Sequence, residues 1–165
     1  MDGNNRSREA VKERLARLEQ EFGSVTINQT TFEVPADRYR RAVDHARDGA
    51  VEIRAVVRND TDEVLLNEAD DGWAVPRGRT RTGESPRSAA ERIVSEDAAV
   101  DCTIRDVASV TITGICNGDD PAAETVYRLL VVFTGEVVDS ADDDGEAVRW
   151  ETEPAVATTS SAELP

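Results

Sequence analysis

Two neighbouring carboxylates, Glu96 and Asp97, follow an arginine at a spacing that suits the binding of a metal-bound phosphate. Arg92 precedes Glu96 by four residues, so on a helix the two side chains share one face and the guanidinium can hold the carboxylate in place. Mg²⁺ prefers oxygen ligands and usually shares one or two protein carboxylates with the phosphates of a substrate. The pattern indicates chemistry on a polyphosphate, and a solvated network of ion pairs is the alternative.

An arginine-rich segment leads into these carboxylates. Residues 77–92 contain five arginines and two glutamates, whereas the whole chain carries a formal charge of −15. The planar guanidinium of arginine forms two parallel hydrogen bonds to phosphate oxygens. We therefore expect an anion-binding loop, with pairing of the arginines to the surrounding acidic surface as the alternative. The five are Arg77, Arg79 and Arg81, which alternate along the loop, and Arg87 and Arg92.

A strand, a loop and a helix are expected to bring these groups together. The run Trp73–Val75 predicts a short strand, and Pro76–Gly83 predicts a loop containing glycine and arginine. Ser85 and Pro86 suit the N-cap and first turn of a helix that continues to about Ala98. Such a unit places the loop arginines beside the helix carboxylates.

The segment from residue 73 to residue 100 resembles the signature of the Nudix hydrolase family. The residues that match the signature are Gly78, Glu84, Arg92, Val94, Glu96 and Val100, and Asp97 keeps a carboxylate where the family has glutamate. Two positions differ, because Ile93 stands where the family has glutamate and Ala99 stands where it has glycine. The order of the surrounding elements extends the resemblance over roughly residues 49–150.

The resemblance implies a fold, an activity and a set of site residues. The fold is an α/β/α sandwich with a mixed β-sheet between helices. The activity is hydrolysis of the pyrophosphate bond in a nucleoside diphosphate-linked small molecule, with Mg²⁺ or Mn²⁺ as cofactor. Glu84 is the expected partner of Arg92. The implied catalytic residues are Glu96, Asp97, Arg92 and Glu84, with Glu96 and Asp97 as metal ligands, and the implied substrate-binding residues are Arg77, Gly78, Arg79 and Arg81.

Ile93 is the main departure from the family, because isoleucine can neither bind a metal nor act as a base. Loss of a general base costs roughly 100- to 10,000-fold in rate. Three alternatives stay open: a carboxylate from another segment replaces it, the enzyme is slow with the metal held by Glu96 and Asp97 alone, or the domain is a nucleotide-binding sensor or interaction module. The candidates for a replacement base are Glu146, Asp144 and Glu124. If residue 93 faces the metal, glutamate at this position should raise activity or metal affinity.

An N-terminal extension precedes the segment that resembles the family. Apolar spacing predicts a helix over Ser7–Phe22, a strand over Val25–Glu33 and a second helix over Asp37–Arg47. We expect the first helix to pack on the body of the protein, with a homodimer contact as the alternative. The chain is thus divided into the extension (1–48), a Nudix domain (49–155) and a C-terminal tail (156–165).

The Nudix-like part is otherwise predicted to be mostly strands around the one helix. That helix is expected to pack through Ala89, Ala90 and Val94, and Ala99 fits if the chain turns there without a left-handed residue. An acidic loop is expected over Asp139–Glu146. The further predicted strands are Val51–Arg58, Glu63–Glu68, Thr103–Val107, Val110–Cys116, Thr125–Val138 and Ala147–Trp150.

Composition limits the class of protein. The 165 residues suit one domain, and no apolar stretch approaches the roughly 20 residues that cross a bilayer, so we expect a cytoplasmic protein without a membrane partner. A charge of −15 makes nucleic acid an unlikely partner. Lys12 is the only lysine, which with the acidic excess is typical of halophiles, whose salt screens such charge. Cys102 and Cys116 are expected to be buried free thiols, and His45 a surface or interface residue rather than a catalyst.

Overall fold

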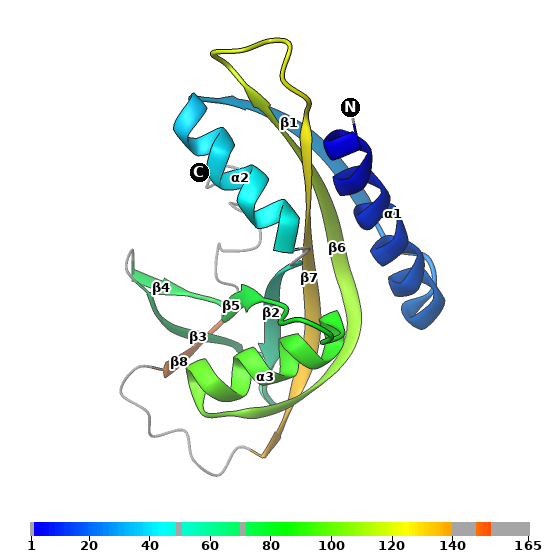
Figure 1. Ribbon diagram of the computed structural model, residues 1–165. Coiled ribbons are helices and arrows are strands. Elements are labelled where there is room, and N and C mark those ends of the chain that lie inside the picture. The colour runs from blue at the N-terminus through cyan, green and yellow to red at the C-terminus, as the bar shows by residue number, and fades with distance from the viewer. Residues whose placement is uncertain (1, 49–50, 70–71, 140–147, 153–165) are drawn as a thin grey trace.

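The computed structural model describes residues 2–48, 51–69, 72–139 and 148–152. Within these ranges three helices surround one mixed sheet of eight strands (Figure 1), and the predicted α/β class is confirmed. The predicted tail (156–165) and nearly all of the acidic loop lie outside the described residues. The helices are α1 (Asp2–Phe22), α2 (Ala36–Asp48) and α3 (Pro86–Ala98); the strands are β1 (Ile27–Val34), β2 (Glu52–Arg58), β3 (Val64–Ala69), β4 (Gly72–Ala74), β5 (Arg77–Arg79), β6 (Asp101–Asn117), β7 (Val126–Asp139) and β8 (Val148–Glu151).

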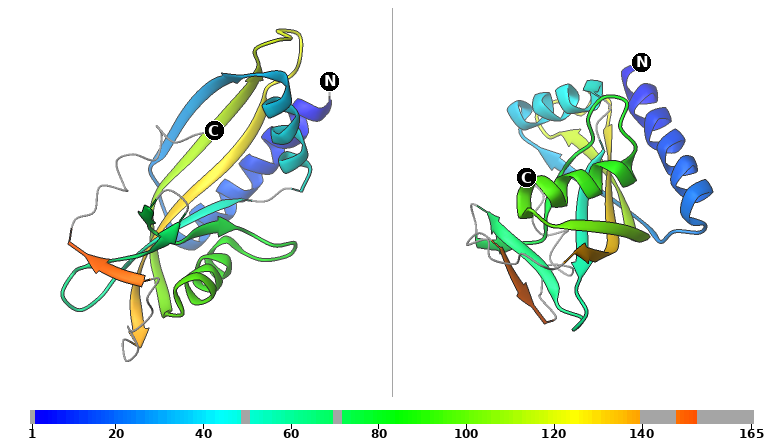
Figure 2. Two further views of the ribbon diagram at one scale, coloured as in Figure 1. Left: turned by 90° about the vertical axis from the view of Figure 1, so that its left-hand side faces the viewer. Right: turned by 90° about the horizontal axis from the view of Figure 1, so that it is seen from below.

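The sheet is organised around its two longest strands. Its order is β1-β6-β7-β2-β3-β4, with β5 beside β2 and β8 beside β3. Strand β1 runs parallel to β6 and β2 runs parallel to β7, whereas β6 and β7 are antiparallel. Figures 1 and 2 show α1 and α2 on opposite sides of β6 and β7. The long central pair therefore carries helices on both faces.

Strand β6 is continuous, so the prediction of two separate strands over Thr103–Val107 and Val110–Cys116 is wrong. Its register against β7 shifts between Ile104 and Asp106 and again between Val107 and Ser109. Such irregularities insert an extra residue and bend a strand while pairing continues on both sides. The polar residues in this stretch therefore bend the strand without ending it.

The loop predicted over Pro76–Gly83 contains the short strand β5, which is a second correction. Gly78 of β5 pairs with Ile53 of β2 in antiparallel register. A strand of three residues is too short to show a periodic pattern, so its sequence carries no signal for it. The pairing anchors the first half of the arginine segment to the sheet.

The two N-terminal helices pack on separate cores. Helix α1 packs on the body of the protein as predicted, since Val11 and Leu18 are buried in the main core and Phe22 lies 5.7 Å from the ring of Phe133. Helix α2 closes a second core with its buried Ala42. That second core also contains Val34, Ile115 and Val126, with Phe32, Tyr39, Val43 and Ala46 packed against it.

Helix α3 begins where the sequence predicts. The Ser85 hydroxyl oxygen accepts a hydrogen bond from the backbone N–H of Ser88 at 3.2 Å, and Pro86 occupies the first turn. The predicted contacts Ala89, Ala90 and Val94 are buried, together with Ile93 and Ala98.

Helix α3 ends on a left-handed residue. Ala99 has φ 55° and ψ 35°, and its N–H donates to the carbonyl of Ser95 at 3.0 Å. The expectation that the chain turns here without a left-handed residue is therefore wrong. This conformation costs alanine roughly 1–2 kcal/mol because its Cβ approaches the following carbonyl oxygen. The left-handed turn leads from the helix into β6, although the sequence lacks the glycine that would relieve its steric cost.

Candidate active site

Glu84 and Arg92 join the arginine segment to α3 through a bidentate ion pair. Arg92 Nε donates to Glu84 Oε2 at 2.8 Å, and Arg92 Nη2 donates to Glu84 Oε1 at 2.9 Å. The hydrogen bonds from Arg92 lower the pKa of Glu84, and the same bonds raise the pKa of Arg92. The contact expected from the Nudix resemblance is present.

The same pair holds the backbone of the loop. Arg92 Nη2 also donates to the carbonyl of Arg79 at 2.8 Å, and the N–H of Arg81 donates to Glu84 Oε1 at 2.9 Å. Gly83 has a φ of +79°, a conformation that favours glycine. The segment between β5 and α3 is therefore fixed at several points to one helix side chain.

Glu96 lies one helical turn beyond Arg92 and contacts two arginines. Arg92 Nη1 donates to Glu96 Oε1 at 3.2 Å, and Arg81 Nη2 lies 3.4 Å from each carboxylate oxygen. The Glu96 side chain is 49% exposed, so its carboxylate is open to a ligand. The sequence predicted the contact with Arg92 and missed the one with Arg81.

Asp97 is exposed and lies within electrostatic reach of Glu96. Partial burial raises the pKa of Asp97, the charge of Glu96 raises it further, and the charge of Arg92 lowers it. Adjacent carboxylates that repel one another are stabilised by a cation between them. Glu96 and Asp97 therefore suit a divalent cation as a pair.

The pair is smaller than a complete protein metal site. Within the described ranges, no group of three or more His, Cys, Asp or Glu side chains is arranged to hold a metal ion. Mg²⁺ usually keeps several waters and binds through one or two carboxylates plus phosphate oxygens. Two carboxylates fit that mode, and the remaining ligands would come from water and a bound phosphate.

Ile93 fills an apolar position against the sheet. Its side chain is 3% exposed and belongs to the main core. A Cβ added at Gly78 would lie 2.9 Å from Ile93 Cδ1, so the two residues are in close contact. The supposition that residue 93 faces a metal is therefore wrong for the isoleucine, which points to the core.

The loop arginines lie in different surroundings. Arg79 Nη2 is 3.2 Å from Nε2 of the half-buried His45, so the histidine contacts the arginine segment. Arg81 reaches Glu96, whereas Arg77 lies exposed on β5. The segment thus presents arginines on more than one side.

Arg87 does not join the loop arginines. Its Nη1 donates to Glu21 Oε2 at 3.2 Å and its Nη2 donates to the carbonyl of Ile104 at 3.1 Å. Its guanidinium also lies over the ring of Phe22, 5.9 Å from the ring centre. Arg87 ties α1 to α3 and β6, which is a structural role.

The candidate replacement bases separate into two groups. Glu146 and Asp144 lie outside the described residues. Glu124 lies in the turn between β6 and β7, where the Tyr39 hydroxyl donates to its backbone carbonyl. Helix α3 leads directly into the other end of β6, so Glu124 is remote from Glu96 and is wrong as a candidate.

The two cysteines differ in burial. Both are free; Cys102 is buried as predicted, whereas Cys116 is only half-buried. Burial raises the pKa of Cys102 to about 12, which keeps it a neutral thiol.

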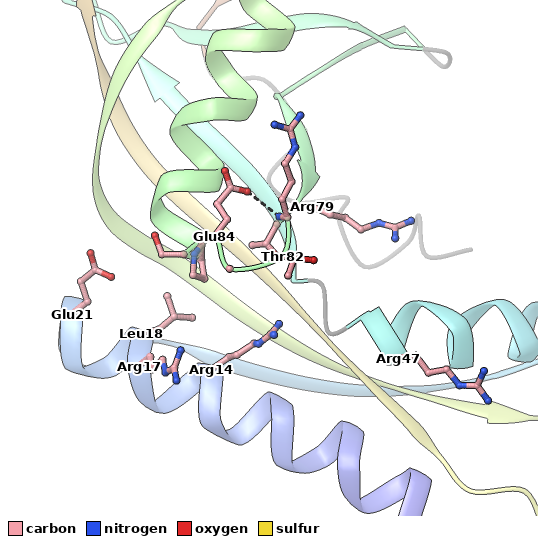
Figure 3. A pocket seen from close by; sticks show the side chains of 13 residues that line it. Arg14, Arg17, Leu18, Glu21, Arg47, Arg79, Thr82 and Glu84 are labelled. Carbon is pink, nitrogen blue, oxygen red and sulfur yellow. Dashed lines mark hydrogen bonds between the residues drawn. The ribbon is translucent and has the colours of Figure 1, made fainter.

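A cleft of about 1110 Å³ lies between the loop, α1 and α2 (Figure 3). Neither Glu96 nor Asp97 lines it. The sequence missed its N-terminal residues, because no local pattern shows that the faces of α1 and α2 meet the loop. The lining residues are the loop segment 79–86, with Arg14, Arg17, Leu18 and Glu21 from α1 and Arg47 from α2.

The family is decided by a match that spans most of the chain. The model of the NUDIX domain matches residues 49–163. The chain belongs to the Nudix family. The predicted class of Nudix hydrolase is thereby confirmed at the level of the family.

Solved structures resemble this Nudix protein at low sequence identity. A UDP-X diphosphatase is 16% identical with a TM-score of 0.45, and the match covers 62% of this chain and 50% of that one, so this chain spans half its length. An ADP-ribose pyrophosphatase from Streptococcus suis is 16% identical with a TM-score of 0.45, covering 62% and 73%. An Ap4A hydrolase from C. elegans is 18% identical with a TM-score of 0.47, covering 70% and 87%. No curated protein matches the sequence.

Among the described segments of this Nudix protein, no helix combines the length and the hydrophobicity needed to cross a bilayer.

Proposed function

We propose that this Nudix protein hydrolyses the pyrophosphate bond of nucleoside diphosphate-linked small molecules, with Mg²⁺ or Mn²⁺ held by Glu96 and Asp97. The observation that carries the proposal is the Glu84–Arg92 ion pair, which fixes the arginine loop beside the helix turn bearing both carboxylates. In the reaction, water attacks one phosphorus and the bond from that phosphorus to the bridging oxygen breaks. The second phosphate leaves with the bridging oxygen.

The side chains of this protein bind and orient the phosphates. Arg81, 64% exposed and 3.4 Å from Glu96, can exchange that contact for a phosphate oxygen, and Arg77, Gly78 and Arg79 are the other proposed substrate contacts. Glu84 and Arg92 hold the loop in register with α3. A divalent cation, when bound, neutralises negative charge on the phosphate oxygens.

Turnover is expected to be slow, because Ile93 supplies no carboxylate. A missing general base lowers the rate by roughly 100- to 10,000-fold. The alternative is that Glu146, from the acidic segment that follows β7, supplies a replacement base, in which case turnover would not be slowed to this extent.

A second function, nucleotide binding without hydrolysis, is favoured by the contact between Ile93 and Gly78. The contact puts a buried apolar side chain at the sequence position where the family carries a carboxylate. In this alternative the arginines still recognise phosphates, and the domain acts as a sensor or an interaction module.

Product release and binding separate the two functions. The protein is incubated in molar KCl with Mg²⁺ and ADP-ribose, a dinucleoside polyphosphate or a nucleoside triphosphate, and released nucleotide and phosphate are measured. The hydrolase predicts release that Asp97→Asn abolishes and that Asp44→Asn, at an exposed aspartate of α2, leaves unchanged. Tight binding without release supports the second function, and release that survives Asp97→Asn contradicts the assignment of Asp97.

The acidic composition supports a proposed cellular setting. We infer a cytoplasmic protein of a halophile, with nucleic acid disfavoured as a partner by the net charge of −15 and with a homodimer as one possible state of assembly. Molar salt shortens the Debye length to about 3 Å and so screens the repulsion between carboxylates. Thermal unfolding at increasing KCl tests this setting, because a halophilic protein gains stability up to molar salt.

A further inference from the structure

The cleft of about 1110 Å³ brings together arginines from parts of the chain that are distant in sequence. Arg14 and Arg17 come from α1, Arg47 from α2, and Arg79 and Arg81 from the loop after β5. Figure 3 shows Arg14 on α1 beneath the loop that carries Thr82, with Arg47 to one side on α2. The N-terminal helices therefore contribute arginines to a cleft that the residues of the Nudix signature alone do not form.

The carboxylates in the lining do not neutralise these arginines. Glu21 pairs with Arg87 at 3.2 Å and Glu84 pairs with Arg92 at 2.8 Å, and neither of those arginines lines the cleft. Both acidic side chains of the lining thus already form ion pairs with arginines that lie outside the lining.

Most of the lining arginines have no acidic partner within the part of the chain that the structure describes. Among the described residues, Arg14, Arg17 and Arg47 form no ion pair, and the guanidinium of Arg79 contacts the imidazole ring of His45. The chain has 34 acidic and 19 basic residues, so arginines without carboxylates are unexpected unless a ligand supplies the negative charge. Clustered cations in one hollow are stabilised when an anion binds between them.

The distribution of the arginines over three segments indicates what shape of anion fits the cleft. A single phosphate is contacted by one or two guanidinium forks, whereas this lining offers five across three segments. Hydroxyl groups of Thr80, Thr82 and Ser85 line the same wall and can donate hydrogen bonds to further oxygens. An extended chain of phosphates matches this arrangement better than one compact ion.

We propose that this cleft binds a triphosphate chain, either free inorganic triphosphate or the triphosphate of a nucleotide. Binding here does not depend on hydrolysis, because Glu96 and Asp97 lie outside the lining. The extension formed by α1 and α2 thereby has a ligand-binding role in addition to its packing.

Calorimetric titration tests the proposal with inorganic triphosphate, ATP, AMP and adenosine, in EDTA so that no divalent metal contributes. Inorganic triphosphate and ATP are expected to bind, AMP at least tenfold more weakly, and adenosine not at all. Equal affinity for triphosphate and ATP identifies the phosphate chain as the only element recognised, and tighter binding of ATP shows that the nucleoside is contacted too. AMP binding as tight as that of ATP overturns the proposal.

Matched arginine variants locate the binding. Arg14→Gln with Arg17→Gln should weaken triphosphate affinity tenfold or more, since the double variant removes two charged hydrogen-bond donors from the lining. The control, Arg40→Gln with Arg41→Gln, removes the same charge from exposed positions of α2 outside the cleft and should change affinity less than twofold. Circular dichroism confirms that both variants are folded. The proposal is overturned if both double variants lose triphosphate affinity equally, or if the Arg14→Gln and Arg17→Gln variant loses none.

Discussion

Ile93 of α3 packs directly on the backbone of Gly78 in β5. A Cβ built on Gly78 would meet Ile93 Cδ1 at 2.9 Å and Cγ1 at 3.0 Å. The close approach of the helix to the arginine segment therefore depends on a glycine on one side and an apolar side chain on the other. In the site of a Nudix protein, this contact occupies the position at which the family carries a carboxylate.

Gly78→Ala is expected to destabilise the protein by about 1–3 kcal/mol, because the added methyl group overlaps a buried side chain. Ile93→Val removes the Cδ1 atom and should reduce the cost of Gly78→Ala in the double variant, although it costs roughly 0.5–1.5 kcal/mol alone. Chemical denaturation of the four proteins of this cycle measures the coupling. If the unfolding free-energy changes of Gly78→Ala and Ile93→Val were strictly additive in the double variant, the added methyl group at residue 78 would not contact the side chain of residue 93.

Ile93→Glu is expected to destabilise the fold rather than to restore a metal ligand. The side chain of residue 93 is 3% exposed, and burying a carboxylate among apolar neighbours costs several kcal/mol or forces its protonation. Thermal unfolding with and without Mg²⁺ measures this, with Ser95→Glu on the exposed face of α3 as the control. A variant as stable as the parent, with stronger Mg²⁺ binding, would show that residue 93 can turn to a metal.

Glu84→Gln is expected to lower the free energy of unfolding by about 1–2 kcal/mol at neutral pH, because it removes a charged partner of Arg92. The pKa of Glu84 in the folded protein lies below its ordinary value of 4.5. Its contribution is therefore complete above that value and is lost as the pH falls through the lowered pKa.

The measurement for Glu84 is unfolding free energy from pH 7 down to pH 3. The parent should lose stability faster than Glu84→Gln over the acid range, so that the two curves converge. Glu136→Gln, which breaks the exposed pair with Arg105, is the control and should change stability by less than about 0.5 kcal/mol. Parallel curves for the parent and Glu84→Gln would contradict a lowered pKa.

Ala99→Gly is expected to stabilise the protein by about 0.5–1 kcal/mol. Glycine adopts a φ of 55° without the steric cost that alanine has there, and this gain exceeds its greater loss of backbone entropy on folding. Ser95→Gly, in the helical part of α3, should instead destabilise by roughly 0.5 kcal/mol. The prediction is checked by measuring the change in melting temperature relative to the parent, which should be positive for Ala99→Gly and negative for Ser95→Gly. A lower melting temperature for Ala99→Gly would contradict it.

Short-range relationships were determined by the sequence itself. Ser85 and Pro86 define the start of α3, and Glu84 and Arg92 form the pair that the Nudix resemblance implies. Arg92 and Glu96 meet because four residues on a helix place two side chains on one face. Local geometry was sufficient for the helix start and for the Arg92–Glu96 contact, whereas the Glu84–Arg92 pair was expected from the resemblance to the family.

Only the tertiary structure decided what depends on distant segments. Ile93 has the spacing of a site residue but turns to the core, because Gly78 of β5 leaves room for it. The two predicted strands of β6 become one because β7 continues to pair with it across the bend. Arg14, Arg17 and Arg47 reach the loop because α1 and α2 pack on the sheet, and that packing depends on buried apolar contacts far apart in the chain.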